Sequence, residues 1–206
     1  MTRVPFTQNH RWHLPLLLLV FCCSFFINNG AIFADIMESR NIITAREMVY
    51  DHNWLVPTMN GELRLEKPPL PTWIAAITEM ISPDNLPLQR AMAGFAAVML
   101  VLFFYKFATK LTDNRTYALV SSLVLCTSYN IILMGRTATW DIYCHAFMMG
   151  AIYYLYLALR QNPCKWTYFI GAGIFMGLSF LGKGPVSFYA LLLPFVCAYI
   201  TAKRLK

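Results

Sequence analysis

The charged residues that could do chemistry are concentrated between Asp35 and Arg90. This segment holds eight of the ten acidic residues of the chain and five of its basic ones. Within it, Asp35 and Glu38 are three residues apart, and Arg40 follows closely. Residues three apart share a face of a helix, so the two carboxylates could act together. A carboxylate can take or orient a proton, and a cation can stabilise negative charge on a leaving group.

A second charged pair lies farther along the same segment. Glu66 and Lys67 directly precede two prolines. Proline restricts its own backbone and that of the residue before it, so this pair is held on a stiff stretch. Judged from residue types alone, it is a charge pair in a loop. Arg46 and Glu47, which lie between the two pairs, are expected to make structural pairs.

Three further charged candidates lie at the ends of apolar runs: Arg136, Asp141 and Lys183. A carboxylate such as Asp141 is a favourable cap at a helix N-terminus, and whether it caps or serves a site stays open. The same holds for Lys183, while Arg136 suits an anchor that reaches the membrane interface. His145, one turn beyond Asp141, is expected to pack rather than to bind a metal. The six cysteines are scattered without metal-binding spacing.

The composition predicts that membrane helices position these residues. Of the 206 residues, 58% are hydrophobic and only 13% are charged, whereas soluble domains carry about 25% charged residues. A charge at the centre of a membrane helix costs about 2.5 to 3.5 kcal/mol, and about 20 apolar residues cross a bilayer. Six charge-free runs meet this description. They lie between Arg11 and Asp35, Arg90 and Lys106, Arg115 and Arg136, Asp141 and Arg160, Lys165 and Lys183, and Lys183 and Lys203.

The distribution of charge between the loops predicts the orientation. With six spans and a cytoplasmic N-terminus, the cytoplasmic pieces hold ten Lys or Arg residues against one acid, and the opposite side holds seven against nine. This bias follows the positive-inside rule, so both termini are predicted to be cytoplasmic and residues 35–90 to lie outside. The net charge of +7 therefore reflects topology, and no nucleic-acid partner is expected. A signal peptide cleaved after Ala34 is disfavoured because Ile32 is bulky where a small residue is required.

The outer loop is expected to carry two short interfacial helices. Residues 36–50 lack Pro and Gly, and Ile36, Ile43 and Tyr50 recur at seven-residue spacing, so one stripe can lie on the membrane surface. The rest is predicted as a turn over 53–61, an extended stretch over 67–71 and a second helix over 72–80. The predicted fold class is an all-α polytopic membrane protein with about six transmembrane helices and a large first extracytoplasmic loop.

The motifs along this loop resemble, in order and spacing, those of a known family. They are Glu38-Ser39-Arg40, Ala45-Arg46-Glu47-Met48, Asn53-Trp54-Leu55-Val56-Pro57, Asn60-Gly61 and Glu66-Lys67-Pro68-Pro69-Leu70, with the shorter motifs Arg136 to Asp141 and Leu181-Gly182-Lys183-Gly184-Pro185. The chain resembles the N-terminal part of the GT-C membrane glycosyltransferases related to 4-amino-4-deoxy-L-arabinose lipid A transferase and to protein O-mannosyltransferases. On this resemblance, residues 1–206 form the N-terminal part of the transmembrane glycosyltransferase domain, and the remainder of that domain is absent.

The resemblance implies an inverting glycosyltransferase of the bacterial cytoplasmic (inner) membrane. A sugar carried on a polyprenyl phosphate would move to a lipid (lipid A-like) or protein acceptor at the outer face, and the partners would be this donor, the acceptor and membrane lipids. No cofactor is certain, and a divalent cation is a candidate. The binding residues implied are Arg40 and Lys67 for the donor phosphate, Glu66 and Asp141 for the acceptor or a cation, and Arg136 and Lys183 as secondary candidates.

One departure from the family pattern affects the catalytic base. In the family an acidic pair opens the loop, and the first acid is the catalytic aspartate. That first position is Met37 here, and Glu38 occupies the second. Either Glu38 takes the role, or Asp35, two residues before Met37, turns in to do so. We expect Glu38 to serve, with Asp35 as the alternative.

Two other classes of protein compete with the enzyme. A transporter would carry ionisable groups at mid-membrane, and the six apolar runs lack Asp, Glu, Lys and Arg. An inactive or complementing fragment that acts as a structural membrane subunit is the second alternative, because members of the family are much longer than this chain.

Overall fold

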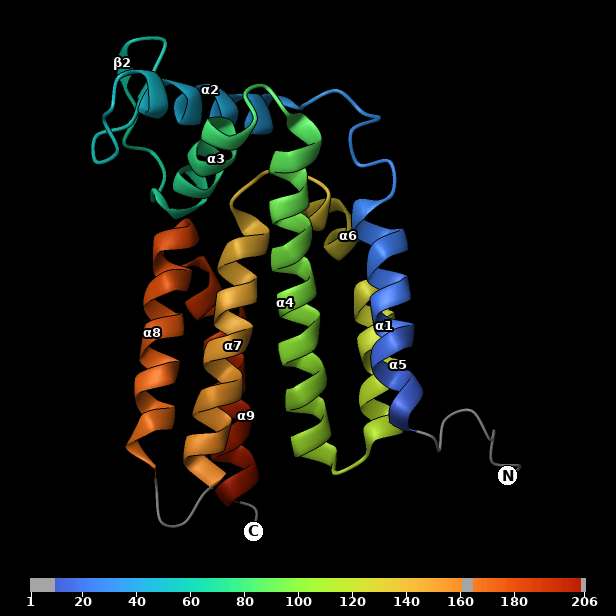
Figure 1. Cartoon of the computed structure of the whole chain (residues 1–206). Helices are drawn as coiled ribbons and strands as arrows, with labels where there is room; N and C mark the ends of the chain where they lie inside the picture. Colours follow the sequence, from blue (N-terminus) through green and yellow to red (C-terminus); the bar gives the residue numbers. More distant parts are fainter. Residues whose placement is uncertain (1–9, 161–164, 205–206) are drawn as a thin grey trace.

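The computed structural model describes residues 10–160 and 165–204, which form a bundle of helices capped at one end (Figure 1). Figure 1 shows α2 and α3 lying across one end of the bundle, which we call the outer end, and the opposite end is called the inner end. The start of α1 and the end of α9 both lie at the inner end. Arg3 and Lys206, which contribute to the predicted charge bias, lie outside the described residues.

The helices of the bundle follow the charge-free runs of the sequence. Each run folds into helix, and the helices that follow one another along the chain run alternately toward the outer and the inner end (Figure 1). The elements are η2 (His10–Trp12), α1 (His13–Phe21), η3 (Cys22–Phe26), α4 (Leu86–Thr112), α5 (Arg115–Cys126), α6 (Tyr129–Gly135), α7 (Asp141–Arg160), α8 (Trp166–Lys183), η4 (Phe188–Leu192) and α9 (Leu193–Arg204).

Within the described ranges, two helices are long and apolar enough to cross a membrane on their own, α4 and α7. The pair α5 and α6 meets the same criterion together but is bent by 66°. The bend lies at Thr127 and Ser128, whose hydroxyls donate to the carbonyl oxygens of Leu123 at 2.8 Å and Leu125 at 2.7 Å, a local alternative to the helical ladder. The structure thus has two or three spans by length and composition, and for α1, α8 and α9 a full crossing stays a prediction.

The outer loop contains the two expected helices and a small hairpin. Helix α2 (Ile36–Tyr50) has the predicted bounds, and α3 (Leu70–Ile81) begins two residues earlier than predicted. Proline is tolerated in the first turn of a helix, so the stretch expected to be extended ends at Pro69. The strands β1 (Thr58–Met59) and β2 (Glu62–Leu63) pair antiparallel around a turn whose two residues have positive φ, as two-residue hairpins require.

Two hydrophobic clusters hold these parts in place. The larger one lies between α1, η3, α4, α5 and α7 and includes Phe21, Phe25 and Ile142. A smaller cluster joins α2 to α3 through Ala45, Met48, Ala75 and Ala76. The small alanines let the two helices approach closely, so the outer loop packs as one unit on the end of the bundle. Of the predicted surface stripe of α2, Ile36 and Tyr50 are exposed and Ile43 is half-buried.

Candidate functional site

Glu38 lies in a closed ion pair at the outer end. Its side chain is 1% exposed, and its Oε2 accepts from Arg90 Nη2 at 2.7 Å. Its Oε1 accepts from Arg90 Nε at 2.8 Å and from the backbone N–H of Ala138 at 2.7 Å. Arg90 also donates to the carbonyl oxygens of Asn29 at 2.7 Å and Ile32 at 2.8 Å. This network joins α2, α4, the chain before α2 and the loop before α7.

The geometry of this pair argues against the expected role of Glu38 as the base. Glu38 and Arg90 border a cavity of about 260 Å³, but the Glu38 side chain is 1% exposed and both of its carboxylate oxygens already accept hydrogen bonds from Arg90 or from Ala138. Removing one partner of a buried pair leaves the other charge uncompensated, which costs about 3 to 5 kcal/mol. Glu38 is therefore better suited to holding Arg90, and through Arg90 the backbone that enters α2.

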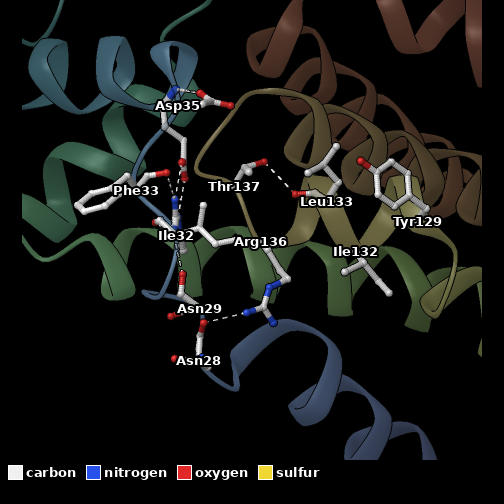
Figure 2. Close-up of a pocket in the computed structure, with 12 residues that line it drawn as sticks. Asn28, Asn29, Ile32, Phe33, Asp35, Tyr129, Ile132, Leu133, Arg136 and Thr137 are labelled. Carbon is white, nitrogen blue, oxygen red and sulfur yellow. Dashed lines mark hydrogen bonds and ion pairs between the residues drawn. The ribbon is translucent and has the colours of Figure 1, made fainter.

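Asp35 has the opposite environment. It is exposed and caps α2, since its Oδ1 accepts from the backbone N–H of Glu38 at 2.7 Å. Together with Glu38 and Arg90, it lines the cavity of about 260 Å³, and of the two carboxylates only that of Asp35 is exposed. Figure 2 shows the segment from Asn28 to Asp35 on one side of this cavity and Tyr129, Leu133 and other residues of α6 on the other. A carboxylate at the edge of a cavity with apolar walls can meet a substrate hydroxyl.

Arg136 lies between these two sides of the cavity (Figure 2). Its guanidinium donates to the carbonyl oxygens of Ser24 at 3.0 Å, Ile27 at 2.9 Å and Asn28 at 3.0 Å. The last carbonyls of a helix have no intrahelical partner, and a cation there satisfies them. Arg136 thus caps the end of η3, and its role as an anchor at the membrane interface stays a prediction.

Lys67 lines a second, much smaller cavity together with Arg64 and Trp140. The Arg64 side chain is 7% exposed, and its Nη1 donates to the carbonyl oxygen of Arg40 at 2.5 Å and to the hydroxyl of Thr44 at 2.6 Å. Its guanidinium carbon lies 5.5 Å from the centre of the Trp140 ring. The cavity measures about 10 Å³, room for one atom of the size of a water oxygen.

Two buried donors at this cavity have no acceptor within the described ranges. They are Arg64 Nη2 and the indole Nε1 of Trp140. Buried N–H groups in proteins are almost always hydrogen-bonded, because leaving one unpaired costs about 1 to 3 kcal/mol. Lys67 lines the same cavity, so the two donors and this lysine make a pocket suited to an anionic oxygen.

The charges around Arg64 explain how the predicted residues relate to one another. Burial lowers the pKa of Arg64, the carboxylate of Glu66 raises it and the charge of Arg40 lowers it further. Arg40 and Glu66 are therefore within electrostatic reach of the same guanidinium. Arg40 and Lys67, expected to converge on one phosphate, both flank Arg64, and the structure gives no direct contact between them.

Asp141 and Lys183 form an ion pair that ties the first turn of α7 to the last turn of α8. Each of the two side chains is about a quarter exposed to solvent. His145 hydrogen-bonds through Nδ1 to the hydroxyl of Ser187 at 2.9 Å, which confirms that it packs against a polar partner. Across residues 10–160 and 165–204, no three His, Cys, Asp or Glu side chains come together as a metal site. A cation at Glu66 would need further ligands.

The expected structural pairs of Arg46 and Glu47 are confirmed. Arg46 pairs with Glu79 and Asp84. Glu47 accepts hydrogen bonds from the Thr58 hydroxyl and from the backbone of the hairpin turn. Burial raises the pKa of Glu47, but these hydrogen bonds outweigh burial and hold the pKa below its ordinary value.

Three residues of the site were not identified from the sequence: Arg64, Arg90 and Trp140. The sequence identified Arg90 only as the boundary of an apolar run and Trp140 only as a member of the motif from Arg136 to Asp141. The signal that could have found Arg64 is its place three residues before Lys67 in a stretch already singled out. Nothing in the local sequence indicates that Trp140 meets it.

The site combines parts that are distant in the sequence. The outer loop meets the segment from Arg136 to Asp141 at Ala138, which contacts Glu38 and Asn41, and at Trp140, which contacts Arg64. The end of α8 joins through Lys183. The three motif regions that the sequence suggested as a site therefore do lie together at the outer end.

Comparisons with known proteins add three findings. The family model "Dolichyl-phosphate-mannose-protein mannosyltransferase" matches residues 66–206. The undecaprenyl phosphate-alpha-4-amino-4-deoxy-L-arabinose arabinosyl transferase of Shewanella sediminis is 32% identical over 165 residues, which are 77% of this chain and 29% of that protein. The protein of the same name from Yersinia enterocolitica is 28% identical over 176 residues, 82% of this chain and 31% of the relative.

Solved structures show a similar fold. The crystal structure of ArnT from Cupriavidus metallidurans in the apo state has a TM-score of 0.74 and 17% identity, covering 98% of this chain and 37% of that one. The crystal structure of the same protein bound to undecaprenyl phosphate has a TM-score of 0.75 and 16% identity, covering 96% and 36%. The chain thus spans about a third of the length of the relatives that it matches.

Proposed function

We propose a function that follows from one fact: the chain belongs to the dolichyl-phosphate-mannose-protein mannosyltransferase family. This membership confirms the resemblance seen in the loop motifs, and the family consists of glycosyltransferases. The proposed reaction is the inverting transfer of a sugar from a polyprenyl-phosphate-linked donor to a lipid (lipid A-like) or protein acceptor. We propose that it takes place at the outer face of the bacterial cytoplasmic (inner) membrane, with both termini cytoplasmic.

The observation that carries the proposal is the anion pocket beside Lys67. Arg64 Nη2 and Trp140 Nε1 are buried donors without an acceptor in the part of the chain that is described, and Lys67 lines the same cavity as these two residues. In the proposed reaction the glycosidic bond to the phosphate breaks, and negative charge grows on the phosphate oxygens. Fixed donors that are already desolvated stabilise such charge without reorganising, so they act on the leaving group. Arg40 is proposed to assist from the exposed side.

Asp35 is the carboxylate that we now favour as the base. It is exposed at the edge of the larger cavity, whereas Glu38 is committed to Arg90. The acceptor hydroxyl would lie in this cavity, give its proton to Asp35 and attack the sugar carbon as the carrier phosphate leaves. Glu66, exposed beside the small cavity, is proposed as an acceptor or cation ligand. Asp141 and Lys183 are proposed to support the site through their ion pair.

A structural membrane subunit is the second candidate. The 206 residues of the chain span about a third of the length of the relatives. In that case the outer end would complete a site together with another chain. The two candidates differ in what the chain does alone: an enzyme transfers sugar, and a subunit binds the carrier phosphate without transfer.

Binding of undecaprenyl phosphate to the purified chain in nanodiscs tests the pocket. Lys67→Ala is expected to weaken binding about tenfold, because a charge-assisted contact to phosphate contributes about 1.5 to 3 kcal/mol. Adding Arg64→Gln to Lys67→Ala should weaken binding of undecaprenyl phosphate further. Lys110→Ala, an exposed lysine at the inner end, is the control and should leave binding unchanged. Equal affinity of the wild type and the Lys67→Ala, Arg64→Gln double variant, with both folded, would reject the pocket.

A further inference from the structure

A separate pair of cavities lies at the inner end, where α4, α7 and α9 come to their ends (Figure 1). One measures about 360 Å³ and the other about 450 Å³. Tyr199 and Lys203 line both, so the two spaces adjoin. They are on the opposite side of the bundle from the candidate site.

The smaller of these two cavities is the more polar one, and two cationic residues line it. Arg160 lines it, and its guanidinium is held by Asp113 at 3.2 Å and by the hydroxyl of Tyr156 at 3.2 Å. The guanidinium carbon lies 5.9 Å from the centre of the Tyr156 ring. Half of the Arg160 side chain remains exposed. Lys203, which lines the same cavity, is exposed and makes no ion pair with any described residue.

The larger cavity is apolar. Besides Tyr199 and Lys203 it is lined by Leu159, Phe195, Val196 and Ile200. The hydroxyl of Tyr199 donates to the carbonyl oxygen of Leu159 at 3.2 Å, and its ring packs on Phe195 with centres 6.2 Å apart. The Tyr199 side chain is therefore held in place between the apolar cavity and the one that Arg160 lines.

The inner end as a whole carries a surplus of positive charge. In the described ranges, its single acid is Asp113, which Arg160 already engages. The basic residues there are Arg11, Lys106, Lys110, Arg115, Arg160, Lys165, Lys203 and Arg204. An anionic group is thus the complementary ligand for this surface, and basic pockets between membrane helices attract anionic lipid headgroups.

We propose that these adjoining cavities bind one anionic glycerophospholipid. Its phosphate lies between Arg160 and Lys203, and one acyl chain lies along Phe195, Val196 and Ile200. The alkyl stem of Lys203 follows the apolar groove while its ammonium reaches the phosphate, as long cationic side chains do at membrane interfaces. A zwitterionic lipid would bring its own cation against two cations, so the site prefers a net negative headgroup. The proposal is independent of the transferase function.

Native mass spectrometry of the 206-residue chain tests this site by titration with phosphatidylglycerol and, separately, phosphatidylcholine of equal chain length. The wild type should bind phosphatidylglycerol about tenfold more tightly. Arg160→Gln with Lys203→Gln should abolish the preference, and Lys203→Gln alone, which breaks no ion pair, should reduce it. Lys165→Gln is the matched control, since Lys165 is exposed at the same end and lines neither cavity.

Two results would overturn the proposal. One is equal binding of the two lipids by the wild type, which would be expected if another protein segment covers the groove or if only acyl chains are recognised. The other is a preference that survives the double variant. A competition with glycerol phosphate examines the apolar part: displacement of the lipid at equal concentration would show that the acyl groove adds nothing and would refute that assignment.

Discussion

Replacing Glu38 by Gln and Asp35 by Asn separates a structural carboxylate from a catalytic one. In Glu38→Gln, one of two oxygens that accept hydrogen bonds becomes an amide donor facing Arg90 or the Ala138 N–H. Arg90, 3% exposed, loses its counter-charge. Breaking a buried pair in this way costs about 3 to 5 kcal/mol. Because 1 kcal/mol shifts Tm by about 2 to 4 °C in a chain of this size, we expect Tm to fall by roughly 6 to 20 °C.

Asp35→Asn should behave in the opposite way. Asn is as good an N-cap as Asp, and the site is exposed, so the free energy of unfolding should change by no more than about 0.5 kcal/mol. If Asp35 is the base, sugar transfer should fall by about 10² to 10⁴, the usual contribution of general-base catalysis. Glu38→Gln is therefore expected to lose thermal stability, and Asp35→Asn is expected to lose sugar transfer.

The assay combines thermal unfolding of the purified variants with transfer from a polyprenyl-phosphate-linked sugar donor, normalised to folded protein. Glu62→Gln, an exposed change on β2, is the control and should alter neither. If Glu38→Gln unfolded at the wild-type temperature while transfer fell a hundredfold, Glu38 would be the base and the closed pair would not describe the working enzyme. If Asp35→Asn kept full transfer, Asp35 would be excluded and Glu66 would be the next candidate.

Three further predictions concern other parts of the molecule. The pKa of Glu47 is lowered in the folded state, so its hydrogen bonds should stabilise the hairpin turn above about pH 4.5 and should be lost as the pH falls through the folded-state pKa. Hydrogen exchange of the turn amides, relative to their intrinsic rates, should therefore rise in that pH range in the wild type. The Glu47→Gln variant should show no such step. Gly182→Ala would place a Cβ 3.1 Å from the backbone of Cys144 and should lower Tm, whereas Gly173→Ala meets open space and should leave Tm unchanged or raised; equal Tm values would show that α7 and α8 can separate. A cysteine introduced at Asn60 should be labelled from the outer side, and labelling from the cytoplasmic side alone would contradict the predicted orientation.

The sequence by itself determined which segments are helical and which carry charge. Apolar runs free of charge fold into the helices of the bundle because burial of nonpolar surface and the cost of burying charge are properties of composition. The bounds of α2 followed from a stretch without Pro or Gly, and the turn at Asn60-Gly61 from residues that tolerate positive φ. The family could also be inferred from the sequence, because the order and spacing of its motifs are visible along the chain.

Only the tertiary structure decided what each charged residue does. Glu38 and Arg90 are separated by 52 residues, and nothing local indicates that they meet as a buried pair. Arg64 and Trp140 come together because α2 and the hairpin lie over the loop before α7, and Asp141 meets Lys183 because α7 and α8 are neighbours. Solvation decides the role of a carboxylate on α2. It can act as a general base when water and substrate reach it, and it is a structural anchor when an arginine and a backbone amide enclose it. Enclosure depends on segments that are distant in the sequence.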